Sequence, residues 1–511
     1  MSAGGAPGSA YEQLSYPGYA YAATDPARLE ATGRLFGLEP APAAGCRVLE
    51  LGCGDGGNAL SIAAALPNAS VVGVDAAGAA VERGVALARA AGLRNVELRC
   101  TDFESLDAGS LGEVDYVVAH GVYSWIPPAA RVALLACVRR VLAPHGIAYV
   151  SYNAYPGSYL RDMARDMLRW HLREVEDPAA RLAGAHELME TIVAIEDPSP
   201  YARVLREHME RMLGVSDALL FHDDLAEIST PFYLHEFAEH AAAHGLRFLA
   251  EADLAESMIR DVPVSAGRLM AGLPDDAVVR EQYLDFFKNR MFRQTLLCRE
   301  EATVRRELDA GVLERLWLSS PAQAVPDDDG PDDEETFATP DGHTMTTSEP
   351  HVRAAMRALG EAWPAALPFA ALAAAARAAV GPDVPEEMIA ARLCDVLLQA
   401  HLARIVALLG CPPHVGARAA ADGAVAADDR PRGSALARAQ LAAGAPVISS
   451  LVHANVALDA PLDRALLPLL DGTRDRATLC QALRAAAPGE PTATDLDAAL
   501  ARLAALGLLQ A

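Results

Sequence analysis

Short apolar runs alternate with amphipathic stretches over the first third of the chain. Five runs have the length of buried strands and are predicted as Cys46–Leu51, Val71–Asp75, Val96–Cys100, Val114–Ala119 and Ile147–Tyr152. The stretches between them place apolar residues at helical spacing, and strands that alternate with helices form a parallel sheet. The pattern therefore predicts an α/β domain whose ligand binds at the carboxyl ends of the strands.

A glycine-rich turn follows the first predicted strand and precedes a predicted helix. Its glycines let the backbone approach a ligand closely, and the helix N-terminus offers unpaired N–H donors. The spacing Gly52-x-Gly54-x-x-Gly57 by itself also fits a dinucleotide. Glu50 before the turn and Asp55 within it would repel a pyrophosphate, however, and would attract an ammonium and a sulfonium. The turn is therefore predicted to bind S-adenosylmethionine.

Polar residues also follow the next three predicted strands. Asp75 ends the second strand, at the position from which a carboxylate binds ribose hydroxyls. Asp102 and Phe103 follow the third strand and suit an adenine amino group and ring face, and His120 with Gly121 follows the fourth. His120 is expected to line the cofactor rather than to act as a base. The predicted cofactor-binding residues are Glu50, Gly52, Cys53, Gly54, Gly56, Asn58, Asp75, Asp102, Phe103, His120 and Gly121.

Further motifs extend past the fifth predicted strand, at Ser151–His171, His222–Leu225, Pro231–Phe237, His244–Asp253 and Phe292–Cys298. With the cofactor residues, they resemble the class I S-adenosylmethionine-dependent methyltransferases that carry a methyltransferase regulatory domain. That family includes the rickettsial outer-membrane-protein lysine methyltransferases. The resemblance covers residues from about 16 to 299 and, more loosely, the C-terminal third. It implies a Rossmann-like sheet of seven strands with S-adenosylmethionine as the methyl donor.

Two more strands are needed for such a sheet, the last of them antiparallel. We assign them to Leu246–Glu251, after a helix over Tyr233–His244, and to Arg293–Cys298. The helical stretches at 157–230 and 254–290 then become insertions into the catalytic domain. They are expected to cap the strand ends or to form the contact of a homodimer.

The rest of the chain divides at changes in composition. We expect a lid segment at 1–40, the cofactor-binding core at 41–156, and helical insertions with the regulatory domain at 157–300. An acidic linker follows at 301–349, then a helical middle domain at 350–411, a second linker at 412–434 and a mostly α, winged-helix-like domain at 435–511. From Asp459 onward this last domain has five arginines against seven acids, which favours contact with protein over contact with DNA.

The loop after the fifth strand is where a methyl acceptor is expected. Methyl transfer needs an aligned acceptor, a shielded site and the removal of one proton. Tyr152, Asn153 and Tyr155 are predicted as catalytic residues because their oxygens could orient an amine; packing against the following helix is the equal alternative. Tyr123 and Trp125 are likewise either pocket wall or ordinary packing. The N-terminal tyrosines form either a lid over the cofactor or part of a docked helix: Tyr11, Tyr16, Tyr19 and Tyr21.

Charge and cysteine content limit the possible substrate class and cellular setting. The net charge of −25 argues against a nucleic-acid substrate and is compatible with a basic polypeptide, although a solvated acidic surface is the favoured explanation. No apolar run reaches membrane-spanning length, and no secretory leader begins the sequence. The eight scattered cysteines suggest reduced thiols in a bacterial cytoplasm. His235, His240 and His244 lack the spacing and third ligand of a zinc site, so no metal is expected.

We therefore expect an S-adenosylmethionine-dependent methyltransferase. The resemblance implies protein lysine side chains as the acceptor. A small-molecule acceptor from a biosynthetic pathway is the first alternative, and a cofactor-binding regulatory scaffold is the second. The intact acids Glu50, Asp75 and Asp102 argue against the scaffold.

Overall fold

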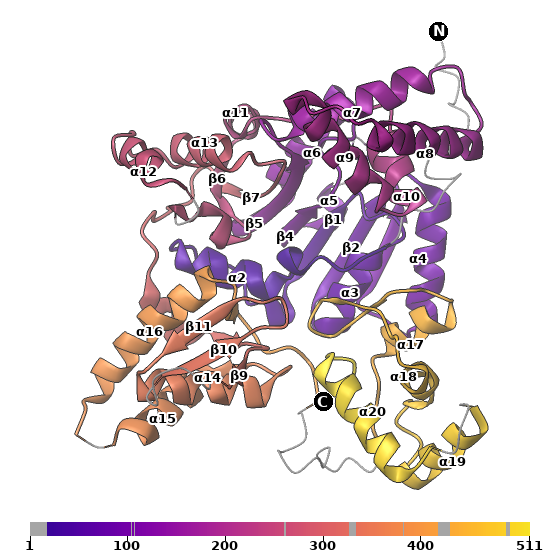
Figure 1. Cartoon of the computed structure of the whole chain (residues 1–511). Coiled ribbons are helices and arrows are strands. Elements are labelled where there is room, and N and C mark those ends of the chain that lie inside the picture. Colours follow the sequence, from indigo (N-terminus) through magenta and orange to yellow (C-terminus); the bar gives the residue numbers. More distant parts are fainter. Residues whose placement is uncertain are drawn as a thin grey trace.

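The computed structural model describes residues 18–510, except 104, 107, 260–261, 327–333, 382, 417–429 and 487–490. A seven-stranded sheet lies at its centre (Figure 1). The strand order is β3-β2-β1-β4-β5-β7-β6, and β7 runs antiparallel to both of its neighbours. The strands are β1 (Arg47–Leu51), β2 (Ser70–Asp75), β3 (Val96–Cys100), β4 (Val114–Ala119), β5 (Leu142–Asn153), β6 (Leu246–Glu251) and β7 (Phe292–Arg299).

This sheet confirms the predicted class I methyltransferase architecture, including the two strands that lie far along the chain. The largest difference in boundaries is in β5, which begins at Leu142 rather than at the predicted Ile147; the other boundaries agree to within one residue. Alternate side chains of each strand enter two different cores. Val48 of β1 packs on one face of the sheet, whereas Leu49 and Leu51 pack on the other.

Helices cover both faces of the sheet and connect its strands. They are α2 (Pro26–Leu35), α3 (Gly57–Ala65), α4 (Gly78–Ala90), α5 (Ala108–Leu111) and α6 (Pro128–Val141), with short 3₁₀ turns η1 (Ala22–Thr24) and η2 (Ala43–Gly45). Leu134 and Leu135 of α6 are fully buried against the second face. Leu29 and Leu35 of α2 are equally buried against the first face, so part of the predicted lid segment is a docked helix.

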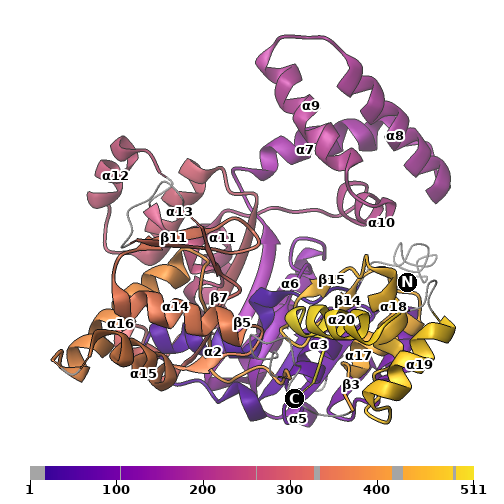
Figure 2. The same cartoon turned by 60° about the horizontal axis from the view of Figure 1, so that its bottom comes forward.

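The first insertion forms a helical lobe that stands away from the body of the molecule (Figure 2). It contains α7 (Ser158–His171), α8 (Pro178–Ala194), α9 (Pro200–Leu213), α10 (Asp217–Leu219) and the π-helical turn η3 (Leu220–Asp224). Its separate core includes Leu168, Met189 and Met209. Around the second insertion lie α11 (Leu234–Ala242), η4 (Leu254–Ser257), α12 (Val264–Ala271) and α13 (Ala277–Lys288), beside β6 and β7.

The segment predicted as an acidic linker at 301–349 is instead largely folded. It contains η6 (Ala310–Arg315) and the short strands β8 (Trp317–Ser319), β9 (Gln323–Val325), β10 (Glu335–Ala338) and β11 (Thr344–Thr347). The acidic run itself, at 327–333, lies outside the described residues. These strands pack with α14 (Pro350–Ala362), β12 (Leu367–Pro368), α15 (Phe369–Val380), α16 (Glu386–Leu402) and β13 (Ala407–Leu409). The linker prediction was wrong because buried residues such as Leu318 and Phe337 join the core that also contains α2.

The last module, residues 430–510, is mostly helical, as predicted. Its elements are α17 (Ala435–Ala442), β14 (Ile448–Ser449), β15 (Asn455–Val456), α18 (Pro461–Leu466), η7 (Leu467–Leu469), α19 (Arg476–Ala486) and α20 (Ala493–Ala505). It has its own core, but Leu436 of α17 packs on Leu60, Ala88 and Ala91 of α3 and α4. We call residues 430–510 the C-terminal module. Within the described part of the chain, no helix has both the length and the apolar character needed to cross a bilayer.

Candidate functional site

The glycine turn between β1 and α3 has a backbone that only glycine adopts readily. Gly52, Gly54 and Gly56 have φ angles of 76°, 57° and 79°, in the left-handed region. No atom lies within 4 Å of the point where a side chain on Gly54 would begin, so open space borders the turn there. A side chain on Gly57 would begin 2.4 Å from the carbonyl carbon of Gly18. The N-terminal segment therefore crosses directly over the turn.

Glu50 is the next-to-last residue of β1, just before this turn, and is only 3% exposed. Its Oε1 accepts a hydrogen bond from Asn58 Nδ2 at 3.0 Å, whereas its Oε2 is buried without a hydrogen-bond partner. Burial raises the pKa of Glu50 to about 8, and hydrogen bonds from Asn58 and the Ala59 backbone offset this only partly. A buried carboxylate without a cation is costly unless a ligand completes it. The residues present therefore fit the ammonium-bearing methyl donor that the sequence predicted.

The other two acids lie along the same edge of the sheet, because β2 and β3 follow β1 in the strand order. Asp75 Oδ2 accepts the Gly54 N–H at 2.8 Å, and its Oδ1 accepts the Ala77 N–H at 2.8 Å. Asp102 is exposed and its Oδ1 accepts the Ser105 N–H at 2.6 Å. Phe103 beside it is half-buried. The structure thus brings these predicted nucleoside-binding residues to one edge. Cys53 is buried within the turn.

His120 forms a wall at the end of β4. Its ring stacks on that of Tyr21, with 3.6 Å between centroids, and its Nδ1 lies 2.9 Å from the Tyr149 hydroxyl. Burial lowers the pKa of His120 to about 4, so the ring is neutral at pH 7. The Gly121 N–H donates to Ser151 Oγ at 2.8 Å. A neutral ring on this edge suits an aromatic or ribosyl neighbour, in keeping with the lining role predicted for it.

Tyr21 makes the N-terminal segment part of the site. Tyr21 stacks on His120, and its backbone N–H donates to Asn58 Oδ1 at 3.0 Å. Residues 18–24 therefore lie on the glycine turn while α2 docks on the sheet, and the lid over the cofactor stays a prediction. Tyr11 and Tyr16 lie outside the described residues. Tyr19 is half-buried.

The three predicted catalytic residues occupy different surroundings. The Tyr152 ring is buried 4.3 Å from that of Phe237, and its hydroxyl lies 3.2 Å from Thr295 Oγ1. Asn153 is buried, and its backbone N–H donates to Ser124 Oγ at 2.9 Å. Tyr155 is half-buried and stacks on Tyr159 at 4.1 Å. Tyr155 is thus the most accessible of the three, and their catalytic role stays a prediction.

The loop after β4 is packed rather than open at Tyr123. Tyr123 is fully buried, and its hydroxyl pairs with His240 Nδ1. The Arg161 guanidinium lies 5.9 Å from the centre of the Trp125 ring.

The histidines in and just after α11 have other partners. His235 contacts Gln282 at 3.0 Å, and His244 contacts the His240 carbonyl at 2.9 Å. Within the described residues, no group of three potential metal ligands comes together.

Residues from the C-terminal module also reach the site, although no pattern in the sequence indicates them. His453 Nε2 lies 2.9 Å from Asn58 Oδ1, and the Asn455 side chain bonds to the backbone of Ala20. These partners are 395 and 435 positions apart, so no local pattern connects them.

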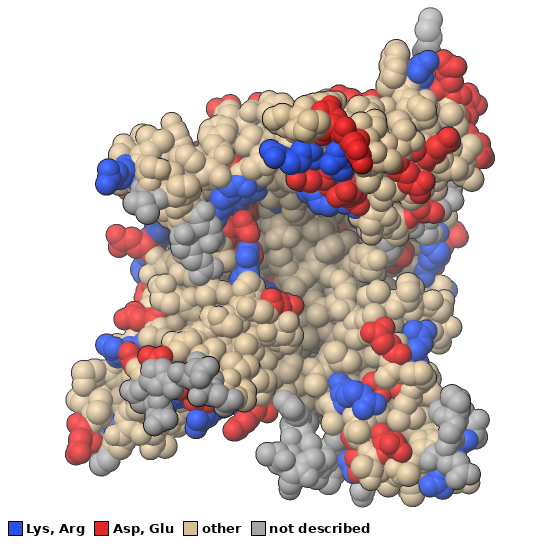
Figure 3. Space-filling view, viewed as in Figure 1, with Lys and Arg blue, Asp and Glu red and all other residues tan. Residues whose placement is uncertain are grey.

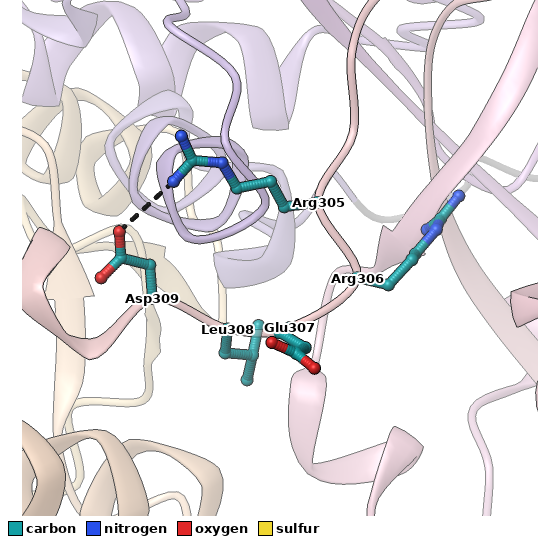
Figure 4. A pocket seen from close by; sticks show the side chains of 5 residues that line it. All are labelled: Arg305, Arg306, Glu307, Leu308 and Asp309. Atoms are coloured by element: carbon teal, nitrogen blue, oxygen red, sulfur yellow. Dashed lines mark ion pairs between the residues drawn. The ribbon is translucent and has the colours of Figure 1, made fainter.

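Two hollows are visible in the molecule. Figure 3 shows one face hollowed near its centre. The hollow lies below the helical lobe and above both the domain at residues 301–411 and the C-terminal module. A separate hollow of about 450 Å³ is lined by five consecutive residues, of which Arg305 and Asp309 form an ion pair at 3.5 Å (Figure 4). None of those five is a predicted site residue.

Three family models match parts of the chain. They describe a methyltransferase domain at residues 48–146, a predicted methyltransferase regulatory domain at 216–299, and the C-terminal winged helix domain of PKMT at 429–503. These matches coincide with the sheet core, with the segment that completes the sheet, and with the C-terminal module.

Similar proteins occur in Rickettsia. An uncharacterized protein of Rickettsia prowazekii (strain Madrid E) is 34% identical over 301 residues, which are 58% of this chain and 54% of that protein. A second uncharacterized protein of the same strain is 33% identical over 241 residues, 47% of this chain and 96% of that protein. The chain therefore spans about half the length of the first relative and nearly all of the second.

The fold is also similar over its whole length to a solved structure, that of PKMT2 from Rickettsia typhi. The TM-score is 0.83 at 24% identity, covering 97% of this chain and 99% of that one. The structure of the same protein in complex with AdoHcy gives a TM-score of 0.82.

Proposed function

Because the chain belongs to the class I S-adenosylmethionine-dependent methyltransferases that carry a methyltransferase regulatory domain, we propose that it N-methylates lysine side chains of a protein. The donor part of this proposal is carried by one observation, the buried Glu50 with its open Oε2 beside the glycine turn. Glu50, Asp75 and Asp102 would hold the ammonium, ribose and adenine of the donor. The bound donor supplies an electrophilic methyl group.

The lysine part rests on the resemblance to the rickettsial lysine methyltransferases and on the whole-length similarity to PKMT2 from Rickettsia typhi. PKMT2 was also solved with AdoHcy, the product of methyl donation. The whole-length likeness and the PKMT winged helix match support the same substrate class here. Lysine has an ordinary pKa of about 10.4, so deprotonating it at pH 7 costs about 4–5 kcal/mol. A desolvating aromatic pocket lowers that cost.

Tyr155 provides an aromatic surface suited to such an acceptor. Its ring stacks on Tyr159 at 4.1 Å and lies 5.4 Å from that of Tyr233, while Tyr159 is 53% exposed. Aromatic faces attract ammonium groups. Burial raises the pKa of Tyr155 to about 12, so its phenol stays neutral and can accept or donate a hydrogen bond near pH 7. We propose that the acceptor binds near the rings of Tyr155, Tyr159 and Tyr233. Tyr152 and Asn153 then position the end of β5.

The net charge, the cysteines and the exposed apolar side chains support proposals about the partner, the cellular setting and the oligomeric state. A net charge of −25 favours a basic protein partner over nucleic acid, and no membrane partner is proposed. All eight cysteines are free, which supports a bacterial cytoplasmic setting. The helical lobe exposes large apolar side chains, among them Trp170 at 71%, Tyr201 at 54% and Ile195 at 48%. We propose this lobe as the contact of a homodimer.

The test uses the whole protein, tritiated S-adenosylmethionine and a bacterial lysate. Labelled macromolecules are hydrolysed, and the expected product is tritiated methyllysine. Label confined to small molecules would favour the small-molecule acceptor instead. Donor binding with no transfer would favour the regulatory scaffold. A Glu50→Gln variant in the same lysate controls for methyltransferases of the host.

A further inference from the structure

Asn58 lies where three distant parts of the chain meet. Its Oδ1 lies 3.0 Å from the Tyr21 N, 3.0 Å from Thr24 Oγ1 and 2.9 Å from His453 Nε2. Its Nδ2 donates to Glu50 Oε1 at 3.0 Å. Asn58 is 3% exposed and His453 is 1% exposed, so water does not compete for these bonds. The amide of Asn58 is thereby fixed with its nitrogen toward Glu50.

The protons at this junction can be assigned. The carbonyl oxygen of Asn58 has two lone pairs and faces three possible donors. Thr24 Oγ1 also lies 2.8 Å from the Tyr21 carbonyl, which can take its single proton. The Tyr21 N–H and the His453 Nε2–H then fill the two lone pairs. Burial lowers the pKa of His453 to about 4, so the ring is neutral and carries its one proton on Nε2.

Asn455 holds the same N-terminal segment at a second point. The Ala20 N–H donates to Asn455 Oδ1 at 2.9 Å, and Asn455 Nδ2 donates to the Ala20 carbonyl at 2.9 Å. This pair of bonds fixes the backbone immediately before Tyr21. The Tyr21 ring then lies on His120, at the wall of the donor site.

We propose that the C-terminal module is part of the methyl donor's site: His453 and Asn455 hold Asn58 and residues 18–24 in place over the glycine turn. The inference rests on the proposed function of that site. His453 and Asn455 are positioning residues, because they act on the donor through Asn58, Glu50 and Tyr21. Undocking the module frees the Asn58 amide to rotate and releases the segment that covers the turn. Donor affinity therefore depends on docking of a domain that lies about 400 positions away in the chain.

The first test measures AdoHcy binding by calorimetry, which needs no methyl acceptor. Asn455→Ala removes two hydrogen bonds and is expected to weaken binding by roughly 5- to 30-fold. Asn455→Asp keeps the acceptor for the Ala20 N–H but sets a carboxylate oxygen against the Ala20 carbonyl, so a loss at least as large is expected. His453 has a φ of 55°, a conformation that asparagine tolerates. His453→Asn therefore shortens the side chain without straining the backbone, and a similar weakening is expected.

The matched control is Thr492→Ala, in the same module. Thr492 caps α20 by accepting the Asp495 N–H, and it does not contact residues 18–24 or Asn58. This variant lowers the stability of the module by loss of a helix cap. AdoHcy affinity should stay within twofold of wild type. In turnover assays, the Asn455 and His453 variants should raise the KM for the donor while kcat at saturating donor changes less than twofold.

A second measurement uses the unchanged protein, so misfolding of a variant cannot obscure the result. Coupling between two sites is reciprocal. AdoHcy should therefore slow amide hydrogen exchange in β14, β15 and the turn between them. Unchanged exchange there, or wild-type affinity in all three variants, overturns the inference and leaves the proposed function standing. A wild-type protein that does not bind AdoHcy overturns both.

Discussion

Glu50 and Glu251 each lie in a strand of the same sheet, and their surroundings differ sharply. Both are buried, at 3% and 2% exposure, and burial raises their pKa values to about 8 and about 7. Glu251 Oε2 nevertheless lies 2.9 Å from Arg290 Nη1 and 2.7 Å from Arg293 Nη2, and its Oε1 accepts the Gln294 N–H at 2.8 Å. Glu50 has no arginine partner within the described residues, and its Oε2 is open.

The difference separates a structural carboxylate from a ligand-binding one. Arg293 also pairs with Glu281 at 2.9 Å and Asp285 at 2.7 Å, so the network ties α13 to β6 and β7. That network supplies its own cations and needs no ligand. Glu50 has only amide donors, and a cation must come from outside to stabilise its charge. Burial alone therefore does not identify a binding site, whereas burial without a counter-ion does.

The largest expected effect concerns the ion-pair network around Glu251. Arg293→Met leaves Glu251, Glu281 and Asp285 with a single arginine. Removing one partner of a buried ion pair costs about 3–5 kcal/mol, and the free energy of unfolding should fall by that amount. Urea denaturation of wild type and variant measures the change. A loss below about 1 kcal/mol would mean that the network does not hold β6, β7 and α13 together.

The next largest effect concerns Glu50 and the binding of the donor. Glu50→Gln removes the charge that is expected to bind the donor's ammonium. Hydrogen bonds to charged groups contribute about 1.5–3 kcal/mol, so AdoHcy affinity should fall roughly 10- to 100-fold. The free energy of unfolding should not fall, because the variant removes a carboxyl group whose burial without a cation is costly.

Glu251→Gln is the matched control for this variant. It should destabilise the protein, because Arg290 and Arg293 lose a counter-ion, and should leave AdoHcy affinity within about twofold once the variant is folded. If both glutamine variants weakened AdoHcy binding equally, the distinction between the two carboxylates would be lost.

The smallest expected effect concerns Tyr152. Its hydroxyl contacts Thr295 Oγ1 at 3.2 Å inside the aromatic core, so Tyr152→Phe should cost about 1 kcal/mol of stability or less. If its role is packing, the methyl-transfer rate should change less than twofold. A rate loss of tenfold or more, measured at saturating donor, would instead support the catalytic role predicted from the sequence.

Local patterns explain what the sequence could predict. Five strands of the sheet follow from short runs that alternate with helical patterns, whereas the strands at 246–251 and 293–298 were assigned because the resembled family has a seven-stranded sheet. The strands at 317–347 have only three or four residues each, too few for alternation to be visible beside an acidic run. The sequence also does not show which face of the sheet Tyr152 lies on, because that depends on the register of β5. Ser151 lies beside His120, and Tyr152 points to the opposite core.

Contacts between distant segments had no such signal. The acids at the carboxyl ends of β1, β2 and β3 (Glu50, Asp75 and Asp102) were recognisable because parallel strands bring these ends to one edge of the sheet. His453 in the turn after β14 and Asn455 in β15 belong to a segment whose sequence suggests no ligand, and only docking of the C-terminal module brings them to Asn58 and Ala20. Tyr21 is one of four tyrosines that precede the first strand, and its stacking on His120 could not be read from the sequence.

Proton release on donor binding tests most directly whether Glu50 is the open carboxylate of the donor site. The pKa of Glu50 is raised to about 8, so the free carboxyl is mostly protonated at pH 7, and a bound cation should restore its ionised form. Calorimetry of S-adenosylmethionine binding in buffers of different ionisation enthalpy should show about one proton more released by wild type than by Glu50→Gln at pH 7. The difference should disappear as the pH rises well above 8, where the free carboxyl is already ionised. Equal proton release by the two proteins at pH 7 would contradict the account.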